Sequence, residues 1–129
     1  MLTTGDVARA SGVGVQTVLF YERAGLIVPP PRRPSGYRMY PESTVSRIRF
    51  IRRAQHLGFK LKEIAELLDL QDRDADCDDV RAAALSKLAD VTNKIADLAH
   101  IQSALENLVQ SCRANGSVRD CVIMESLKR

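Results

Sequence analysis

Three cysteines are the residues of this chain whose type and spacing point most directly to chemistry. Cys112 follows Cys77 by 35 positions, and Cys121 follows Cys112 by nine, past a glycine-containing loop. Thiolates are soft ligands for metal ions, and thiols are also the groups that oxidise to disulfides. The two histidines are not placed to join them, because His56 is far away in the sequence and His100 precedes Cys112 by about 18 Å of helix. The cysteines therefore predict either a three-thiol metal site or a redox switch.

The stretch from Cys77 to Cys112 is predicted to be one long helix, since neither Pro nor Gly interrupts it. Counting four and three residues alternately from Cys77 gives a heptad seam that is apolar from Leu88 to Val109 at every position but Gln102. The seam positions are Cys77, Arg81, Ala84, Leu88, Val91, Ile95, Leu98, Gln102, Leu105, Val109 and Cys112. This pattern predicts a coiled coil with the same helix of a second copy.

The length of this helix restricts where a three-thiol site can form. A helix from Cys77 to Cys112 is roughly 50 Å long, so these two thiols cannot meet within one chain. In an antiparallel pair, Cys77 of one chain arrives beside Cys112 and Cys121 of the other, which gives two identical three-thiol sites. The alternative is that the cysteines are small apolar residues without a ligand. Two cysteines in register on the seam, with a third one loop away, favour the metal site.

Composition and charge are those of a small protein with a basic first half. The chain has 129 residues, a net charge of +3 and 45% hydrophobic residues. Residues 1–70 carry eleven Lys/Arg against six Asp/Glu, or +5, whereas residues 71–129 carry eight against ten, or −2. This asymmetry favours a nucleic-acid-binding head and a separate dimerisation and sensing tail. With no apolar run of transmembrane length and no signal-peptide pattern, we expect a cytoplasmic protein with reduced thiols and no membrane contact. We expect no enzyme, because the sequence contains no catalytic constellation.

Residues 1–25 are typical of a helix-turn-helix. A first short helix follows Thr3 and stops at Gly12, and a second runs from residue 15 to a terminating Gly25. The second helix of such a motif enters the major groove of DNA. The residues expected to face DNA are Gln16, Thr17, Tyr21 and Arg23, and those expected in the core are Val15, Val18 and Leu26.

A segment rich in Pro and Gly between Ile27 and Pro41 is predicted to form a turn or hairpin wing. Its expected phosphate contacts are Arg32, Arg33 and Arg38, with Tyr37 and Tyr40. The alternative is a solvated basic loop. A third helix is expected from Pro41 to Leu57, a fourth over residues 61–70 and a short amphipathic tail after Cys121. The buried face of the third helix is expected to consist of Val45, Ile48, Ile51 and Leu57, and its arginines Arg47, Arg49, Arg52 and Arg53 are partly phosphate candidates. The fold class is all-α with a small β wing.

The sequence carries a family resemblance over nearly its whole length. The strings TVLFYERAGLIVPPPRRPSGYRMYPEST and IRFIRRAQHLGFKLKEIAELLDL resemble the DNA-binding head of MerR-type transcription regulators. The tail, from CDD to SCRANGSVRDCVIMESL, resembles the metal-sensing end of mercury-responsive members. Two positions depart from the pattern: Leu19, where members commonly carry Arg, and Val122, where mercury regulators often have Pro.

The resemblance implies a homodimer on a pseudo-palindromic promoter with an overlong spacer, which metal binding distorts so that RNA polymerase can engage. It implies Cys77, Cys112 and Cys121 as metal ligands and a winged helix-turn-helix over about Thr3 to Tyr40. We expect a DNA-binding domain at 1–70, a linker and dimerisation helix at 71–111, and a metal-binding loop with a short C-terminal helix at 112–129.

Hg(II) is the expected inducer, because it accepts trigonal thiolate coordination. Pb(II) or Cd(II) is the alternative, since the spacing also resembles lead-responsive relatives, and Zn(II) is under-equipped with three ligands. Copper-sensing relatives lack the cysteine at the start of the long helix. A thiol redox switch that pairs Cys112 with Cys121 is a further alternative, although it leaves Cys77 unexplained.

Overall fold

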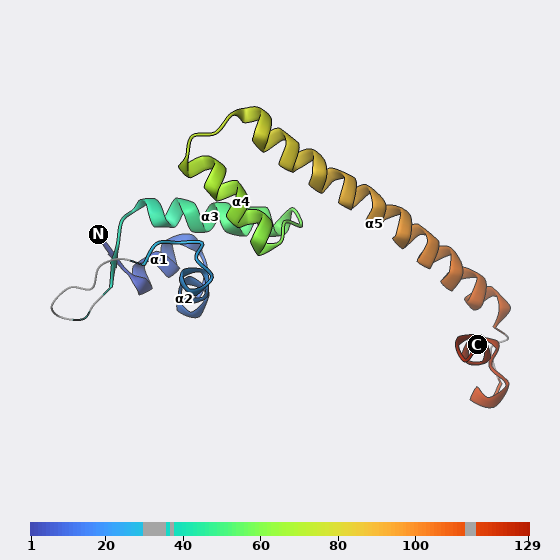
Figure 1. Ribbon diagram of the computed structural model, residues 1–129. Helices are drawn as coiled ribbons and strands as arrows, with labels where there is room; N and C mark the ends of the chain where they lie inside the picture. Colours follow the sequence, from blue (N-terminus) through green and yellow to red (C-terminus); the bar gives the residue numbers. More distant parts are fainter. Residues whose placement is uncertain (30–35, 37, 113–115) are drawn as a thin grey trace. The chain divides into compact units, whose positions relative to one another are not determined.

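The structure is a computed structural model that describes residues 1–29, 36, 38–112 and 116–129 (Figure 1). The elements are β1 (Leu2–Thr3), α1 (Thr4–Ser11), α2 (Val15–Arg23), β2 (Met39–Tyr40), α3 (Ser43–His56), α4 (Leu61–Asp72), α5 (Cys77–Ser111), the 3-10 helix η1 (Val118–Asp120) and α6 (Val122–Leu127). The predicted mostly helical fold with a small antiparallel sheet is confirmed. Two compact units form, Met1–Lys87 and Leu88–Arg129. No helix in the described ranges is long and apolar enough to cross a membrane.

Helices α1 and α2 form the predicted helix-turn-helix. The Thr3 side chain accepts a hydrogen bond from the Asp6 N–H at 3.1 Å, and the Asp6 carboxylate accepts one from the Thr3 N–H, so that a capping box starts α1. Gly12 ends α1 at φ 73, a left-handed conformation that a side chain would strain. Local capping and a glycine stop therefore fix the turn between the two helices.

The two-stranded sheet joins the N-terminus to the end of the predicted wing. Strands β1 and β2 are antiparallel, with Leu2 opposite Tyr40 and Thr3 opposite Met39. The pattern of residues 27–41 did not reveal this pairing, because β1 contributes only two residues. The wing residues 30–35 and 37 lie outside the described residues, and this range includes the predicted contacts Arg32, Arg33 and Tyr37.

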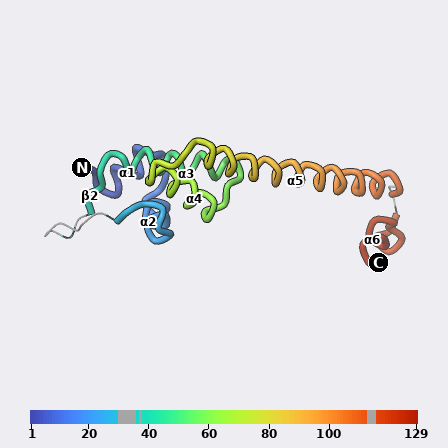
Figure 2. The backbone as a smooth tube through the Cα atoms, turned by 45° about the horizontal axis from the view of Figure 1, so that its top comes forward, coloured from blue at the N-terminus to red at the C-terminus, as the bar shows by residue number. Residues whose placement is uncertain are grey.

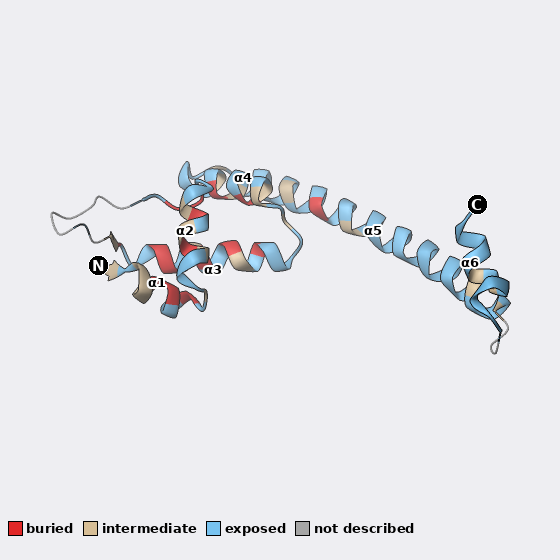
Figure 3. Ribbon diagram, turned by 90° about the horizontal axis from the view of Figure 1, so that it is seen from below, coloured by how far each residue is buried: buried red, intermediate tan, exposed pale blue. Residues whose placement is uncertain are grey.

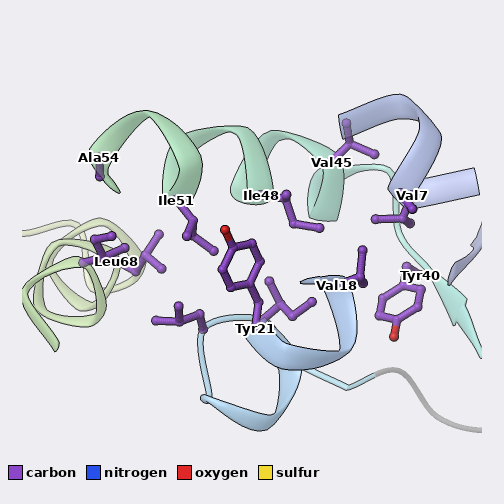
Figure 4. Close-up of a cluster of buried hydrophobic side chains, with 13 residues drawn as sticks. Val7, Val18, Tyr21, Tyr40, Val45, Ile48, Ile51, Ala54 and Leu68 are labelled. Atoms are coloured by element: carbon purple, nitrogen blue, oxygen red, sulfur yellow. The ribbon is translucent and has the colours of Figure 1, made fainter. Parts of the chain in front are cut away.

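A single hydrophobic cluster joins α1 to α4 (Figure 4). The core members are Val7, Ala8, Val18, Tyr21, Leu26, Ile27, Tyr40, Val45, Ile48, Ile51, Ala54, Ile64 and Leu68. Two core predictions are wrong: Val15 is 42% exposed and Leu57 is 69% exposed. Val15 opens α2 on the solvent side, and Leu57 lies past the last turn of α3, where Gly58 turns the chain at φ 91.

Three arginines of α3 satisfy backbone carbonyls of neighbouring segments. Arg49 donates to the carbonyl of Ala10 at 2.9 Å, and Arg52 donates to that of Gly12 at 2.8 Å. Arg47 donates to the Leu26 carbonyl at 2.7 Å and also pairs with the Asp72 carboxylate. The last carbonyls of a helix have no partner within the helix, so Arg49 and Arg52 have a structural role at the end of α1, and Arg47 has one at the segment that follows α2.

Helix α5 is continuous for 35 residues, as the backbone trace shows (Figure 2). It begins at Cys77 and ends one residue before Cys112, as predicted. Almost all of it is exposed in the single chain (Figure 3), including the apolar side chains of the heptad seam. The exposed seam residues are Leu88, Ile95, Leu98, Leu105 and Val109. Most of the buried residues belong to the head.

Candidate thiol site and nucleic-acid interface

Two of the three predicted ligands, Cys112 and Cys121, lie beside each other at the C-terminal end of the chain. Cys112 directly follows α5, and its N–H donates to the Val109 carbonyl at 3.2 Å. Cys121 lies between η1 and α6 and is the N-cap residue of α6. Both thiols are half-buried and free of disulfide bonds, and they are close enough for each to shift the pKa of the other. One end of the chain thus carries two soft donors near each other.

The pKa values of the two thiols are shifted in opposite directions. Hydrogen bonds from the N–H groups of Met124 and Ile123 lower the pKa of Cys121, and the Cys112 side chain adds to this effect. Burial raises the pKa of Cys112 first, and the neighbouring charge and hydrogen bond of Cys121 raise it further. Cys121 therefore ionises first and accepts the hydrogen bond of the Cys112 thiol. The thiolate is the form that binds metal, so Cys121 is the ligand that is ready at lower pH.

Cys77 is at the other end of α5. It is exposed and begins the helix, so that roughly 50 Å of helix separates it from Cys112. Among the described residues, no three His, Cys, Asp or Glu side chains form a group that could hold a metal ion. One chain therefore provides a two-thiol pair at one end of α5 and a single thiol at the other, and neither alone is a three-thiol site.

The exposed seam of α5 forms an apolar groove near its C-terminal end, with a volume of about 730 Å³. Its lining is formed by Leu98, Ile101, Gln102, Leu105, Glu106, Val109 and Gln110. An amphipathic helix normally buries its apolar stripe, and a stripe of this length on one face is typical of an interaction surface. The face of α5 that has the cysteines at its two ends is thus also the face whose apolar side chains are exposed in the single chain.

The predicted contacts at Tyr21 and Tyr40 are wrong, because both rings are buried. Tyr40 is fully buried in the core, and its hydroxyl donates a hydrogen bond to Glu22 Oε2 at 3.1 Å. The Tyr21 ring is 3% exposed and lies in the core (Figure 4), and its hydroxyl donates a hydrogen bond to Gln55 Oε1 at 2.8 Å. Burial also raises the pKa of this phenol. Tyr21 follows Val18 by three positions, so both side chains lie on the same face of α2. That spacing was the signal that could have placed Tyr21 in the core.

The other predicted contacts on α2 are accessible. Gln16 and Arg23 are exposed, and Thr17 is half-buried. Leu19, the position that departs from the family pattern, lines a shallow pocket together with Arg23 and Arg38. The side of α2 opposite the core thus remains open to a ligand, with one arginine at its C-terminal end.

Arg38 is held by a carboxylate that the sequence did not single out. Its Nη1 donates to Glu22 Oε2 at 2.6 Å, and the Tyr40 hydroxyl donates to the same oxygen at 3.1 Å. The Glu22 side chain is only 8% exposed, whereas that of Arg38 is 32% exposed. Guanidinium has five N–H donors in a fixed fork, so Arg38 keeps donors for a second anion while Glu22 orients it. This ion pair ties the base of the wing to the last turn of α2.

Comparison with family models and curated proteins gives consistent matches. The model described as MerR HTH family regulatory protein matches residues 2–71, and the one described as MerR, DNA binding matches residues 45–108. A mercuric resistance operon regulatory protein of Bacillus cereus is 43% identical over 97% of this chain and 96% of its own length.

Two solved structures are also similar over nearly the whole chain. The regulator PbrR691 of Ralstonia metallidurans CH34, in complex with lead(II), is 36% identical with a TM-score of 0.89, and the match covers 98% of this chain and 99% of that one. The dual-function regulator MerR of Bacillus megaterium MB1, in complex with mercury(II), is also 36% identical, with a TM-score of 0.78 and complete coverage of both chains.

The unequal acidities predict the order in which the thiols react. At neutral pH the lowered pKa of Cys121 leaves it with the larger thiolate fraction, so iodoacetamide should alkylate Cys121 faster than Cys112. The difference should narrow as the pH rises, because Cys112 then ionises as well. Peptide mass spectrometry after short pulses measures both rates, and in denaturant the two should react alike. Faster labelling of Cys112 at neutral pH would contradict the assigned hydrogen bonds.

Proposed function

The chain belongs to the MerR family of helix-turn-helix regulatory proteins, and on that premise we propose that it regulates a mercury resistance operon in response to Hg(II). In this proposal a homodimer binds promoter DNA through its two heads and senses the metal through its cysteines. Metal binding then distorts the promoter so that RNA polymerase can start transcription. The relatives named above are regulators, and we propose no enzymatic activity.

The observation that carries the proposal is the division of the thiols along α5. The Cys112–Cys121 pair is at one end of an exposed apolar seam, and Cys77 is at the other. Antiparallel pairing of two seams covers the apolar stripe and places Cys77 of each chain beside the thiol pair of its partner. Two sites with three soft ligands each result, one at each end of the coil.

Mercury is preferred over the other soft ions for reasons of both chemistry and similarity. Three thiolates suit Hg(II), whereas Zn(II) usually takes four ligands. The mercuric resistance regulator of Bacillus cereus is 43% identical to this chain, whereas the lead-bound and mercury-bound structures are both 36% identical. The TM-score is higher for the lead-bound protein than for the mercury-bound one. A TM-score compares the arrangement of the helices and carries no information on metal preference. Pb(II) and Cd(II) remain the alternative inducers.

A redox switch is the second candidate, because one specific observation favours it. Cys112 and Cys121 are close enough to shift each other's pKa, and the lowered pKa of Cys121 supplies a thiolate for oxidation. A disulfide between them would leave Cys77 without a role and would not require the dimer. Induction by peroxide in the absence of metal salts, retained in Cys77→Ser, would favour this candidate.

The DNA surface in our proposal consists of the open side of α2 and the wing. Gln16, Thr17 and Arg23 contact DNA from α2, and Arg38, with Arg32, Arg33 and Tyr37, contacts phosphates beside it. Tyr21 is removed from this set because it is buried. Arg38 is the best defined of the wing contacts, since Glu22 fixes its direction.

The shared metal site predicts that two inactive variants complement each other. One variant carries Cys77→Ser and the other carries both Cys112→Ser and Cys121→Ser. Neither homodimer has a complete three-thiol site, although the first retains the two-thiol pair. A mixed dimer, purified by two different tags, regains one complete site and leaves the other empty.

The readout for the mixed dimer is the thiolate-to-mercury charge-transfer absorbance of a three-sulfur site, titrated in excess competing monothiol. We expect about one such site per mixed dimer, none in either parent and two in the unmodified dimer, together with partial recovery of Hg(II)-dependent transcription. Mixed dimers that show no more three-sulfur signal than their parents would contradict the cross-chain site.

The proposed role of Arg38 predicts a loss of affinity that does not depend on DNA sequence. Arg38→Ala should weaken binding to operator and random DNA alike and reduce the slope of log K against log salt by about one unit for each half-site. Arg73→Ala serves as the matched control, because Arg73 lies at the end of α4 and pairs with Asp69. Binding curves at several salt concentrations measure both effects. Loss confined to one base position would instead indicate a base contact.

A further inference from the structure

The only buried residue of the long helix α5 is a lysine. Lys87 is 6% exposed, whereas the rest of this fully described helix is exposed or half-buried in the single chain (Figure 3). An ammonium group loses hydration when it is buried, and it is stable there only with a charged or hydrogen-bonding partner. The seam of α5 explains the apolar residues of this helix, but neither the seam nor the thiols explain a buried charge at this position.

Lys87 contacts the beginning of α4 through two groups. Its Nζ lies 2.8 Å from Glu63 Oε1 and 5.6 Å from the centroid of the Phe59 ring. The same oxygen of Glu63 accepts a hydrogen bond from the Lys60 N–H at 2.8 Å, which caps α4. The hydrogen bond from Lys87 is the main cause of the lowered pKa of Glu63. One carboxylate therefore connects the first turn of α4 to α5.

These contacts lead directly to the core of the DNA-binding head. Phe59 packs against the core cluster, and Ile64, the residue after Glu63, is completely buried within it. Lys87 is also the last residue of the compact unit that contains the head. It lies ten positions after Cys77, or about 15 Å along the helix axis. A rigid helical segment thus extends from a thiol at its start to an ion pair with the head.

We propose that Lys87 is the positioning residue that couples the metal site to the DNA-binding head. This inference rests on the proposed function, in which a metal ion holds Cys77 against the thiols of the partner. The helical segment from Cys77 to Lys87 moves as one piece, and the ion pair with Glu63 transfers its displacement to α4. The apolar side chains of α4 pass it to the core that carries α2. Lys87 touches neither metal nor DNA.

A coupling role and a merely structural role of Lys87 predict different effects of its replacement: loss of the metal response in the first case and loss of stability in the second. If Lys87 only stabilises the fold, its replacement lowers the melting temperature and leaves the response of the folded protein to metal intact. If Lys87 couples the two sites, the variant still binds metal, and without metal it still binds DNA. Metal binding then no longer changes the activity of the DNA-bound protein. Coupling between sites typically amounts to a factor of about 5–150, so its loss is measurable.

The experiment compares Lys87→Met with Lys94→Met in the full-length dimer. Both substitutions remove one positive charge from α5 and keep an unbranched side chain, but Lys94 is exposed. Three quantities are measured: Hg(II) binding by charge-transfer absorbance, operator affinity without metal, and the rise in transcription in vitro on addition of Hg(II). For Lys87→Met we expect Hg(II) affinity and metal-free operator affinity within about threefold of the unmodified protein. The Hg(II)-dependent rise in transcription should fall by about tenfold or more. Lys94→Met should behave as the unmodified protein in all three.

Two further variants keep the test decisive if Lys87→Met does not fold. Glu63→Gln keeps an oxygen for the α4 cap but removes the charge that pairs with Lys87, so it should also reduce the rise while Hg(II) binding persists. Lys87→Arg retains the ion pair and should restore most of the response.

A full response to Hg(II) in Lys87→Met or Glu63→Gln would overturn the coupling role, as would a Lys87→Met protein that no longer binds Hg(II). An unmodified protein that shows no response to Hg(II) would contradict the proposed function itself. A failure of the coupling role alone leaves the unmodified response intact, so the two failures are distinguishable.

Discussion

The length of α5 is the constraint on which the rest of the molecule depends. A helix rises 1.5 Å per residue, so the 35 residues from Cys77 to Ser111 separate the single thiol from the thiol pair by roughly 50 Å. No rearrangement of side chains can close that distance while the helix stays intact. The apolar seam along the same helix is exposed in the single chain. In the function we propose, a second antiparallel copy supplies both the cover for this seam and the missing thiol, so that dimerisation and metal binding depend on the same helix.

The head is organised so that few contacts connect this helix to the DNA surface. A small core holds α1 to α4 together, and Lys87 is the one residue of α5 buried in the single chain. At the edge of this core, Glu22 holds the Arg38 guanidinium in a short ion pair and also accepts a hydrogen bond from the core residue Tyr40. In both places a carboxylate fixes a cation from another segment.

Much of this fold could be predicted, because its local signals are strong. The capping box at Thr3, the glycine stops and the heptad period of α5 each depend on residues close in sequence. The errors arose where distant residues decide the outcome. The polar group of Tyr21 favours a DNA contact in the sequence, whereas the Tyr21 hydroxyl donates to Gln55, 34 positions away, and the ring lies in the core. The pairing of β1 with β2, the Glu22–Arg38 ion pair and the unequal acidities of Cys112 and Cys121 likewise depend on tertiary contacts that no short pattern encodes.

The central claim is that the metal ion is shared between two chains, and counting the sulfur atoms around Hg(II) tests it most directly. X-ray absorption at the mercury edge, recorded on the unmodified protein with one equivalent of Hg(II) per chain, gives this number without any substitution. A site that combines Cys77 of one chain with Cys112 and Cys121 of the other predicts three sulfur neighbours. Two sulfur neighbours would show that the adjacent pair in one chain binds the ion alone, and would contradict the shared site.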